Sequence, residues 1–253
     1  MTARLLPLFM VLSGTFSMYS QTKQSPTNGL DKTYFKSKGA EFVPTGSYID
    51  ASGNIISVHA FFMTNEVTNK EYREFADDVV AHPDSSLYYF DRSEASVSKQ
   101  QVRFSQIREI LIDTLAMAVK YTTGSERYNK YKTYFTNKNY DDYPVVGVSY
   151  EAAKYYCIWK TTRENAALKK EGRGLMNDFR VPQKEELEYA KSFSKSRQGM
   201  PVKEVNKSKS GKPDKLGLYN LSGNVEELNS SKATSQTSAI PTGFRMVSTF
   251  LGK

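Results

Sequence analysis

The stretch YPVVGVSYEAAKYYCIWK, residues 143–160, carries the clearest folding signal in the chain. Ser149 suits a helix N-cap, because its side-chain oxygen can accept a hydrogen bond from a backbone N–H of the first turn. Four apolar or aromatic residues then recur at the three-to-four-residue spacing of one helical face. They are Ala152, Tyr155, Tyr156 and Trp159. The stretch therefore predicts a helix that begins after Ser149 and buries an aromatic stripe.

A second helix is predicted to begin after Thr68. Thr68 and Glu71 have the spacing of a capping box, in which each side chain bonds to the other residue's backbone N–H. Val67 and Tyr72 occupy the two positions of a hydrophobic staple. A third helix is predicted from Pro182, since proline is well suited to a first helical turn.

Two strands are predicted before the helix at Thr68. AEFVPTGSYID, residues 40–50, alternates and contains Pro44 and Gly46, which indicates a strand that leads into a turn. NIISVHAFFMTNEVTN, residues 54–69, continues as a second strand, with His59 as a half-buried strand residue.

The segment between the first two helices, about residues 82–142, reads as a helical insertion. Its centre places five apolar residues on one helical face, which predicts an amphipathic helix over residues 98–121. They are Phe104, Ile107, Leu111, Leu115 and Ala118. This helix could pack on its own domain or dock on a partner protein, as could the aromatic-rich segment 121–143. The lysine- and serine-rich residues 191–215 read as a solvated loop.

Composition and the N-terminus indicate an exported globular protein. The chain has 253 residues, 39% of them hydrophobic, and a formal net charge of +8, but its lysines are scattered without a nucleic-acid-binding signature. Residues 1–20 contain Arg4, an apolar run and small residues, which is typical of a secretory signal peptide. Polar residues 21–40 then read as a flexible leader. We expect a periplasmic or otherwise exported protein that does not span a membrane. Association with the outer membrane is one form that this expectation takes.

The chain offers few residues for catalysis. Cys157 is the single cysteine, so an internal disulfide is excluded, and its place in a helical pattern favours burial. The two histidines, His59 and His82, lack the neighbouring ligands of a zinc site. The sequence contains no phosphate-binding loop and no nucleophile elbow.

Ordered blocks of the sequence resemble the formylglycine-generating enzyme, or sulfatase-modifying factor, family. They are FVPTGSY (42–48), FFMTNEVTNKEYREF (61–75), YPVVGVSYEAAKYYCIWK (143–160), FRVPQKEELEYA (179–190), GLYNLSGNVEEL (217–228) and GFRMV (243–247). Tyr150 and Leu187 stand where the family usually has tryptophan, and so does Leu228. The order of the blocks is more specific than any one of them.

The resemblance implies an irregular α+β fold of the formylglycine-generating type, related to C-type lectins and shortened at its C-terminal end. On this interpretation residues 41–253 form one degenerate domain interrupted by the insertion at 82–142. The resemblance assigns calcium ligands to the Asn220 side chain, the Gly223 and Val225 carbonyls, and Glu227. Calcium favours such a mixture of carboxylate, amide and backbone oxygens. An ordinary turn at these residues is the alternative.

The resemblance also implies that the oxidase chemistry is lost. Catalytic relatives hold copper(I) with two closely spaced cysteines between the Gly-Asn-Val block and the terminal Gly-Phe-Arg, because soft thiolates select that ion. Here LNSSKATSQTSAIPT, residues 228–242, contains no cysteine. We therefore predict no catalytic residues, no copper and no enzyme activity.

Three functions follow from these observations. The first is a scaffold or accessory subunit of a periplasmic or outer-membrane protein complex, because blocks such as HPDSSLYYFD (82–91) resemble exported relatives in Bacteroidota gliding motility and type IX secretion. The second is a calcium-dependent module that binds glycan or peptidoglycan. The third is a residual oxidase. Neither nucleic acid nor a small-molecule substrate is expected.

Overall fold

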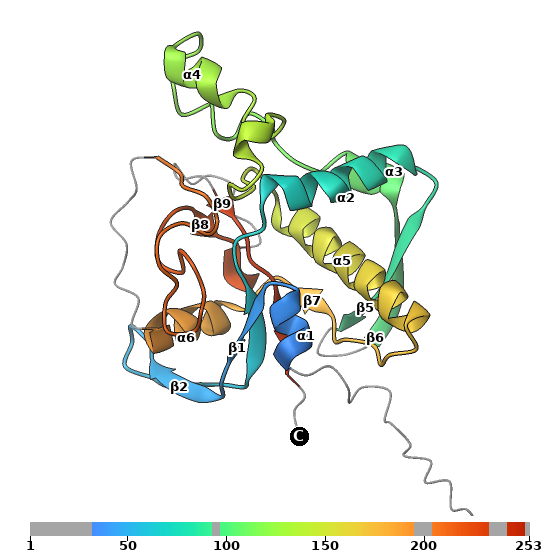
Figure 1. Cartoon of the computed structure of the whole chain (residues 1–253), viewed down its shortest axis with the longest axis vertical. Helices are drawn as coiled ribbons and strands as arrows, with labels where there is room; N and C mark the ends of the chain where they lie inside the picture. The colour runs from blue at the N-terminus through green and yellow to red at the C-terminus, as the bar shows by residue number, and fades with distance from the viewer. Residues whose placement is uncertain (1–31, 93–96, 195–203, 233–241, 251–253) are drawn as a thin grey trace, which may run out of the picture.

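The computed structural model describes residues 32–92, 97–194, 204–232 and 242–250. Helices and strands are mixed throughout, and much of the chain between them is irregular (Figure 1). The predicted signal peptide, residues 1–20, lies outside the described residues. Among the described residues, no helix is both long and apolar enough to cross a lipid bilayer.

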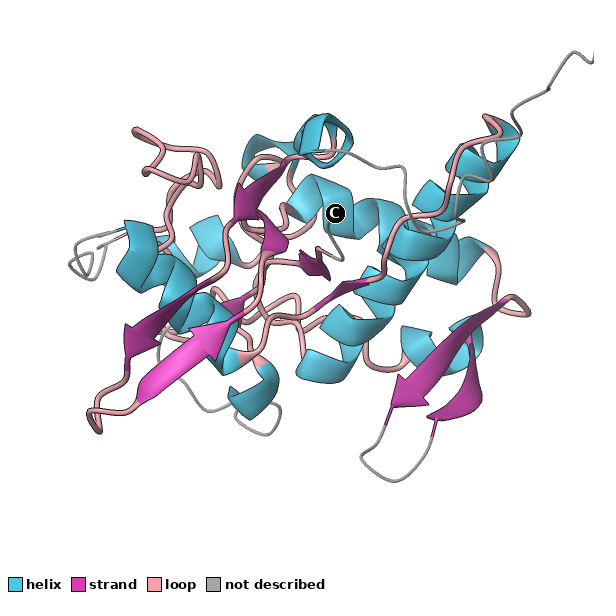
Figure 2. Ribbon diagram, turned by 90° about the horizontal axis from the view of Figure 1, so that it is seen from below, coloured by secondary structure: helices cyan, strands magenta, loops and turns pink. Residues whose placement is uncertain are grey.

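A four-stranded antiparallel sheet lies at the centre of the molecule (Figure 2). Its strand order is β1 (Ala40–Val43), β4 (Phe61–Thr64), β10 (Val247–Thr249) and β7 (Phe179–Arg180). All four residues of β4 are buried, as expected for an interior strand with apolar side chains on both faces. Because β10 lies between β4 and β7, residues near the end of the sequence complete the sheet that residues near its beginning start.

The predicted first strand and turn are confirmed, whereas the predicted second strand is wrong in its extent. Residues 54–69 form two strands: β3 (Ile55–Val58), paired with β2 (Gly46–Ile49) in a hairpin, and β4. The hairpin turn is closed by Asp50, whose Oδ1 accepts backbone N–H bonds from Ser52 and Asn54, each at 2.8 Å. His59 lies between β3 and β4 and is exposed, not half-buried.

Two helices cover the core with the predicted caps. α2 (Asn69–Ala81) begins after Thr68, whose Oγ1 accepts from the Glu71 N–H at 3.2 Å, while Glu71 Oε2 accepts from the Thr68 N–H at 2.8 Å. α5 (Tyr150–Lys170) begins after Ser149, whose side chain accepts from the Ala152 N–H at 3.1 Å. All four residues of the predicted stripe on α5 are buried. Tyr72 of α2 stacks on Tyr156 of α5 with ring centroids 5.5 Å apart.

The predicted helix over residues 98–121 is wrong. The insertion instead contains a hairpin and short helical turns: β5 (Ser86–Arg92), β6 (Val97–Arg103), α3 (Phe104–Arg108), α4 (Glu126–Tyr131) and the 3-10 turn η1 (Lys138–Tyr140). Most of the predicted apolar face is nevertheless buried; only Leu115 is exposed.

Tertiary contacts explain why a helix does not form there. The Asp113 N–H donates to the Gly147 carbonyl at 2.8 Å, and Asp113 Oδ1 accepts from the Leu115 N–H at 2.9 Å. These bonds use backbone N–H groups that a helix would need, and they hold residues 113–115 in a turn. Gly147 has φ +81°, and a Cβ there would collide with the Asp113 carbonyl and Ala116 Cβ. The glycine thus allows the insertion to approach the segment before α5.

The remaining elements refine two further expectations. Residues 32–40 were expected within a flexible leader, but α1 (Lys32–Ser37) is a helix that buries Tyr34 and Phe35. α6 (Lys184–Ser194) begins two residues after Pro182 rather than at it. Two residue pairs, β8 (Glu226–Glu227) and β9 (Thr242–Gly243), run parallel, and η2 (Ser230–Lys232) follows β8.

Glu164 on α5 holds α1 in place through a half-buried polar cluster. Its carboxylate accepts from Tyr34 Oη at 3.3 Å and pairs with Lys38 Nζ at 2.7 Å and Lys160 Nζ at 3.4 Å. Burial by itself raises the pKa of Glu164, but the hydrogen bonds and charges of Lys38 and Lys160 outweigh burial and leave the pKa below its usual value. The ionised carboxylate therefore stabilises the folded chain.

We expect Glu164→Gln to lower the free energy of unfolding at pH 7 by on the order of 1 kcal/mol, measured by urea denaturation. Because the folded pKa lies below the unfolded one, this contribution is present above the unfolded pKa and is lost as the pH falls through the folded pKa. The two proteins should therefore converge in stability as the pH falls below the folded pKa of Glu164. Glu188→Gln, which removes an exposed partner of Lys191 at 3.6 Å, is the control and should change stability by less than about 0.5 kcal/mol. An unchanged difference at low pH would refute the electrostatic account.

Candidate functional site

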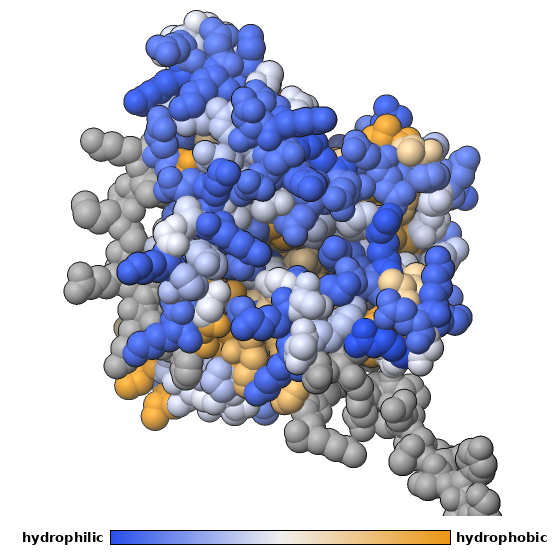
Figure 3. Space-filling view, viewed as in Figure 1, coloured by the Kyte–Doolittle hydropathy of each residue, from blue (hydrophilic) through white to orange (hydrophobic). Residues whose placement is uncertain are grey.

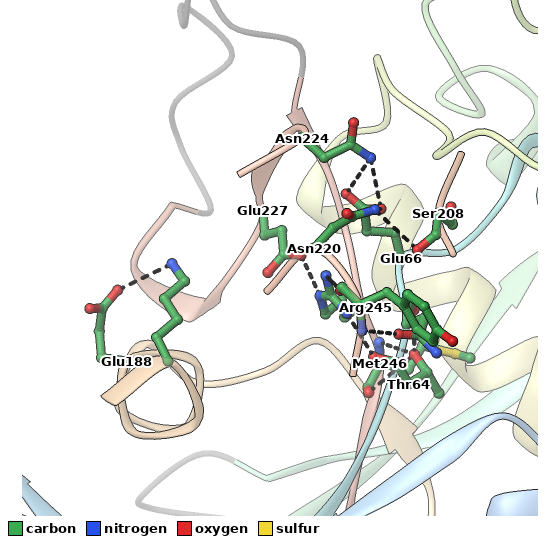
Figure 4. Close-up of polar contacts among 12 residues, drawn as sticks. Thr64, Glu66, Glu188, Ser208, Asn220, Asn224, Glu227, Arg245 and Met246 are labelled. Atoms are coloured by element: carbon green, nitrogen blue, oxygen red, sulfur yellow. Dashed lines mark hydrogen bonds and ion pairs between the residues drawn. The ribbon is translucent and has the colours of Figure 1, made fainter. Parts of the chain in front are cut away.

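The candidate site is the loop of residues 217–228, packed against the junction of β4 and α2 (Figure 4). Its path requires left-handed backbone angles at four positions. Gly217 has φ +89°, Asn220 φ +52°, Gly223 φ +129° and Asn224 φ +66°. Glycine carries no Cβ penalty in this region, and asparagine tolerates it better than most residues. The Asn and Gly content of the loop therefore has a direct conformational cause.

Arg245 lies fully buried beneath this loop. Its Nε donates to Glu227 Oε1 in an ion pair between side chains that are 0% and 4% exposed. One Nη donates to the Tyr219 carbonyl at 2.6 Å and the other to the Thr64 carbonyl at 3.4 Å. The guanidinium thus joins the loop, the end of β4 and the segment before β10 through bonds to a side chain and two carbonyls.

Glu66, also buried, contacts the loop from the side of α2. It accepts from Asn224 Nδ2 at 3.1 and 2.9 Å and from Asn220 Nδ2 at 3.2 Å. Burial raises the pKa of Glu66 to about 8, with Glu227 adding to the rise and Arg245 and the two asparagine amides opposing it. At neutral pH the Glu66 carboxyl is therefore mostly protonated, and the buried charges of Arg245 and Glu227 balance each other.

Residues 204–210 form a loop that is mostly exposed, as predicted, but that also contacts the site. The Asn206 N–H donates to Asn224 Oδ1 at 2.7 Å, and Asn220 Nδ2 donates to the Lys207 and Ser208 carbonyls at 3.0 and 3.1 Å. Ser208 is buried. Residues 195–203 of the predicted loop lie outside the described residues.

The four predicted calcium ligands occur in this one loop, but the two that would use side chains engage other partners. Glu227 Oε1 is bound by Arg245, and the Asn220 amide directs its nitrogen toward Glu66, with Oδ1 3.4 Å from Ser210 Oγ. Gly223 adopts the left-handed backbone described above, and Val225 is buried next to β8.

The residues present fit a calcium ion by their donor chemistry. Glu227 Oε2 and Ser208 Oγ are buried oxygens without a hydrogen-bond partner, an arrangement that a bound cation would satisfy. A half-turn of the Asn220 amide would turn its oxygen toward Glu66 in place of its nitrogen. In the described part of the chain no cluster of three or more histidine, cysteine, aspartate and glutamate side chains could hold a metal ion. The predicted set differs from such a cluster because it uses mainly amide and carbonyl oxygens.

Sequence reasoning missed Glu66, Asn224, Ser208 and Arg245. Two of them had a readable signal: Arg245 stands between Phe244 and Met246, and Glu66 follows a buried apolar strand. A charged residue at such a position must find a buried partner, because an unpaired buried charge is costly. The sequence does not tell which partner that is.

Comparison with protein families matches residues 8–210 to the sulfatase-modifying factor enzyme 1-like domain. The chain belongs to this family. The mixed α+β architecture agrees with that membership. No curated protein matches the chain. The matched range includes the insertion and ends before the loop at 217–228, so the ligand assignment within that loop rests on the resemblance of its own residues.

The buried ion pair leads to a stability prediction. Removing one member of a buried pair leaves an uncompensated charge, which costs about 3–5 kcal/mol, whereas replacing both by apolar residues is often close to neutral. We expect Arg245→Met to lower the free energy of unfolding by that amount in urea denaturation, and the Arg245→Met/Glu227→Leu double variant to recover most of the loss. Lys207→Met, which removes an exposed pair with Asp142 at 3.1 Å, serves as the control. Additive losses in the double variant would show that the two charges do not depend on each other.

Proposed function

We propose that this chain is a non-catalytic, exported member of its family that serves as a scaffold or accessory subunit of a periplasmic or outer-membrane protein complex. The resemblance to Bacteroidota relatives in gliding motility and type IX secretion supports the finer assignment to one of those assemblies. The observation that carries the proposal is the state of the single thiol, because the oxidase chemistry of catalytic relatives depends on paired cysteines.

Cys157 is unsuited to replace a pair of copper-binding thiolates. It lies on α5 within the main hydrophobic core and is buried. Burial raises the pKa of the Cys157 thiol well above its usual value, with only a partial opposing effect from the charge of Arg180. A thiolate is the reactive and metal-binding form, so a protonated thiol in an apolar core favours an inert structural role.

The segment that holds the cysteines in catalytic relatives also supports the proposal. Residues 228–242 connect Glu227 to Gly243 without a cysteine, and we regard this connection as shortened relative to oxidases of the family. Residues 233–241 lie outside the described residues. The flanking Glu227 and Arg245 still meet in the ion pair. Thus the scaffold can persist without the oxidase site, as expected where a fold and its chemistry are separable.

The insertion offers the scaffold a surface for partners. Residues 121–143, including α4, project from the body of the molecule (Figure 1). Five tyrosines of this segment pack in ring pairs with centroids 4.9–6.4 Å apart, in a cluster that also includes Val146 and Val225 of the body. The tyrosines are Tyr121, Tyr131, Tyr134, Tyr140 and Tyr143. An ordered projection of this kind suits a binding element better than a flexible loop would.

A test of catalysis distinguishes the scaffold from an oxidase. The purified protein is loaded with copper(I) and incubated with a Cys-x-Pro-x-Arg peptide, and aldehyde is detected by mass spectrometry. We expect no aldehyde above the protein-free blank, and no difference between the wild type and Cys157→Ser. Native-state thiol labelling should also leave Cys157 unmodified until the protein is unfolded. Copper-dependent aldehyde formation would overturn the proposal.

A calcium-dependent binding module is the second candidate, supported by the unpartnered Glu227 Oε2 in the loop. Asn220, Gly223, Val225 and Glu227 would hold the ion, which would give the unpartnered Glu227 Oε2 a ligand bond. A glycan or peptidoglycan strand is the ligand expected for such a module. The calcium site and the scaffold role are compatible, because a structural ion can stabilise a subunit that catalyses nothing.

Calcium titration by isothermal calorimetry tests this candidate. We expect saturable binding, a higher melting temperature with calcium than with EDTA, and about tenfold weaker binding by Asn220→Ala, which removes a ligand. Ser210→Ala is the matched control: its hydroxyl lies 3.4 Å from Asn220 Oδ1 but is not assigned to the ion, so binding should stay unchanged. If the wild type binds no calcium, the calcium-dependent binding module is ruled out, whereas the scaffold proposal is unaffected.

A further inference from the structure

The outer face of the β5–β6 hairpin exposes large apolar side chains that the core does not use. Tyr88 and Phe90 on β5 are 55% and 65% exposed, and Val97 on β6 is 66% exposed. The opposite face of the hairpin is the one that packs, since Leu87 and Val102 are buried and Tyr89 contacts Tyr155 of α5. Figure 3 shows hydrophobic atoms among hydrophilic ones at the right-hand edge, where Figure 1 places this hairpin.

The strand register places cationic and polar side chains beside the aromatic ones. Tyr88 lies opposite Gln101 and Phe90 opposite Lys99, so all four share the outer face. Lys99 Nζ lies 5.0 Å from the Tyr88 ring centroid, which agrees with this placement. Arg103 follows on the same strand face. The face therefore combines an aromatic column on β5 with a column on β6 that carries positive charge.

The hairpin also presents a strand edge. β5 and β6 form a two-stranded sheet in the described residues, and six of the seven residues of β6 are exposed. The Phe104 N–H donates to the Ser85 carbonyl at 2.9 Å, which makes this a hydrogen-bonded pair of the ladder. Because such pairs alternate along an antiparallel ladder, the backbone groups of Lys99 and Gln101 point away from β5. An unpaired edge of this kind can accept another strand.

We propose that the β5–β6 hairpin is a docking surface for an extended segment of a partner protein that carries acidic and apolar side chains and adds to β6 as a third strand. This inference rests on the scaffold function proposed above. The open edge favours an extended segment, Lys99 and Arg103 favour acidic side chains, and Tyr88, Phe90 and Val97 favour apolar ones. A second copy of this chain is disfavoured, because antiparallel pairing of two β6 strands would add cationic residues to a face that is already cationic.

The other exposed hairpin provides a matched control surface. Ile49 and Ile55 lie opposite each other on β2 and β3 and are 70% and 74% exposed, but no exposed aromatic residue accompanies them. Figure 3 shows this apolar corner at the lower left. Replacing the two isoleucines by serine removes a comparable apolar surface from a place that the proposal does not involve.

The experiment selects binders from a phage-displayed library of random twelve-residue peptides against the purified full chain, and measures their affinities by fluorescence anisotropy. Enriched peptides should be acidic with alternating apolar residues. Their affinity should fall at least about tenfold for Phe90→Ser, which removes an exposed aromatic ring. It should fall by a similar factor for Gln101→Pro, because proline lacks the N–H that points away from β5 and would bond to the added strand. Lys99→Glu should shift the selection toward basic peptides. Ile49→Ser/Ile55→Ser should bind as the wild type does, and circular dichroism confirms that each variant folds.

Three outcomes would overturn the proposal. In the first, no peptide is enriched, or the enriched peptides bind the hairpin variants as tightly as the wild type. In the second, sedimentation shows a dimer that Phe90→Ser dissociates, so that a second copy is the occupant. In the third, vesicles with anionic lipid bind in a Phe90-dependent manner and peptides do not. Failure here is separable from failure of the scaffold proposal, because the aldehyde assay does not involve the hairpin.

Discussion

The structure depends on the burial of one positive charge. Arg245 is enclosed completely, so its guanidinium must find both acceptors and a balancing negative charge within the protein. Glu227 supplies the charge, and carbonyls of β4 and of the 217–228 loop supply acceptors. These groups come from segments far apart in the sequence. The central sheet, the loop and the end of the chain can therefore reach their final positions only together.

The same ion pair closes the segment that connects β8 to the end of the sheet. Glu227 and Arg245 flank residues 228–242 and hold the two ends of that segment together without a thiol. Cys157 contributes to the apolar core instead. The β5–β6 hairpin and the tyrosine-rich projection both belong to the insertion and expose side chains outside this core.

The insertion shows where sequence patterns mislead. Apolar residues at three-to-four-residue spacing predict a helix, yet here four of the five reach the core from a short helix and a series of turns. The pattern predicts which side chains are buried, but it does not determine the backbone conformation. An irregular backbone can bury the same side chains when hydrogen bonds to other segments satisfy its N–H and carbonyl groups. Those bonds come from elsewhere: the Gly147 carbonyl binds the Asp113 N–H, and β5 pairs with β6.

Features that depend on local interactions or on hydrophobicity could be predicted from the sequence alone. The caps at Thr68 and Ser149, the buried stripe on α5, the glycine in the 217–228 loop and the burial of Cys157 each depend on residues close in sequence, or on hydrophobicity alone. The membership of the family was likewise readable from ordered blocks. Only the tertiary structure decided that Arg245 pairs with Glu227, that Glu66 meets Asn220 and Asn224, and that β6 offers an edge. Each of these depends on long-range packing, which brings together groups that no local pattern relates.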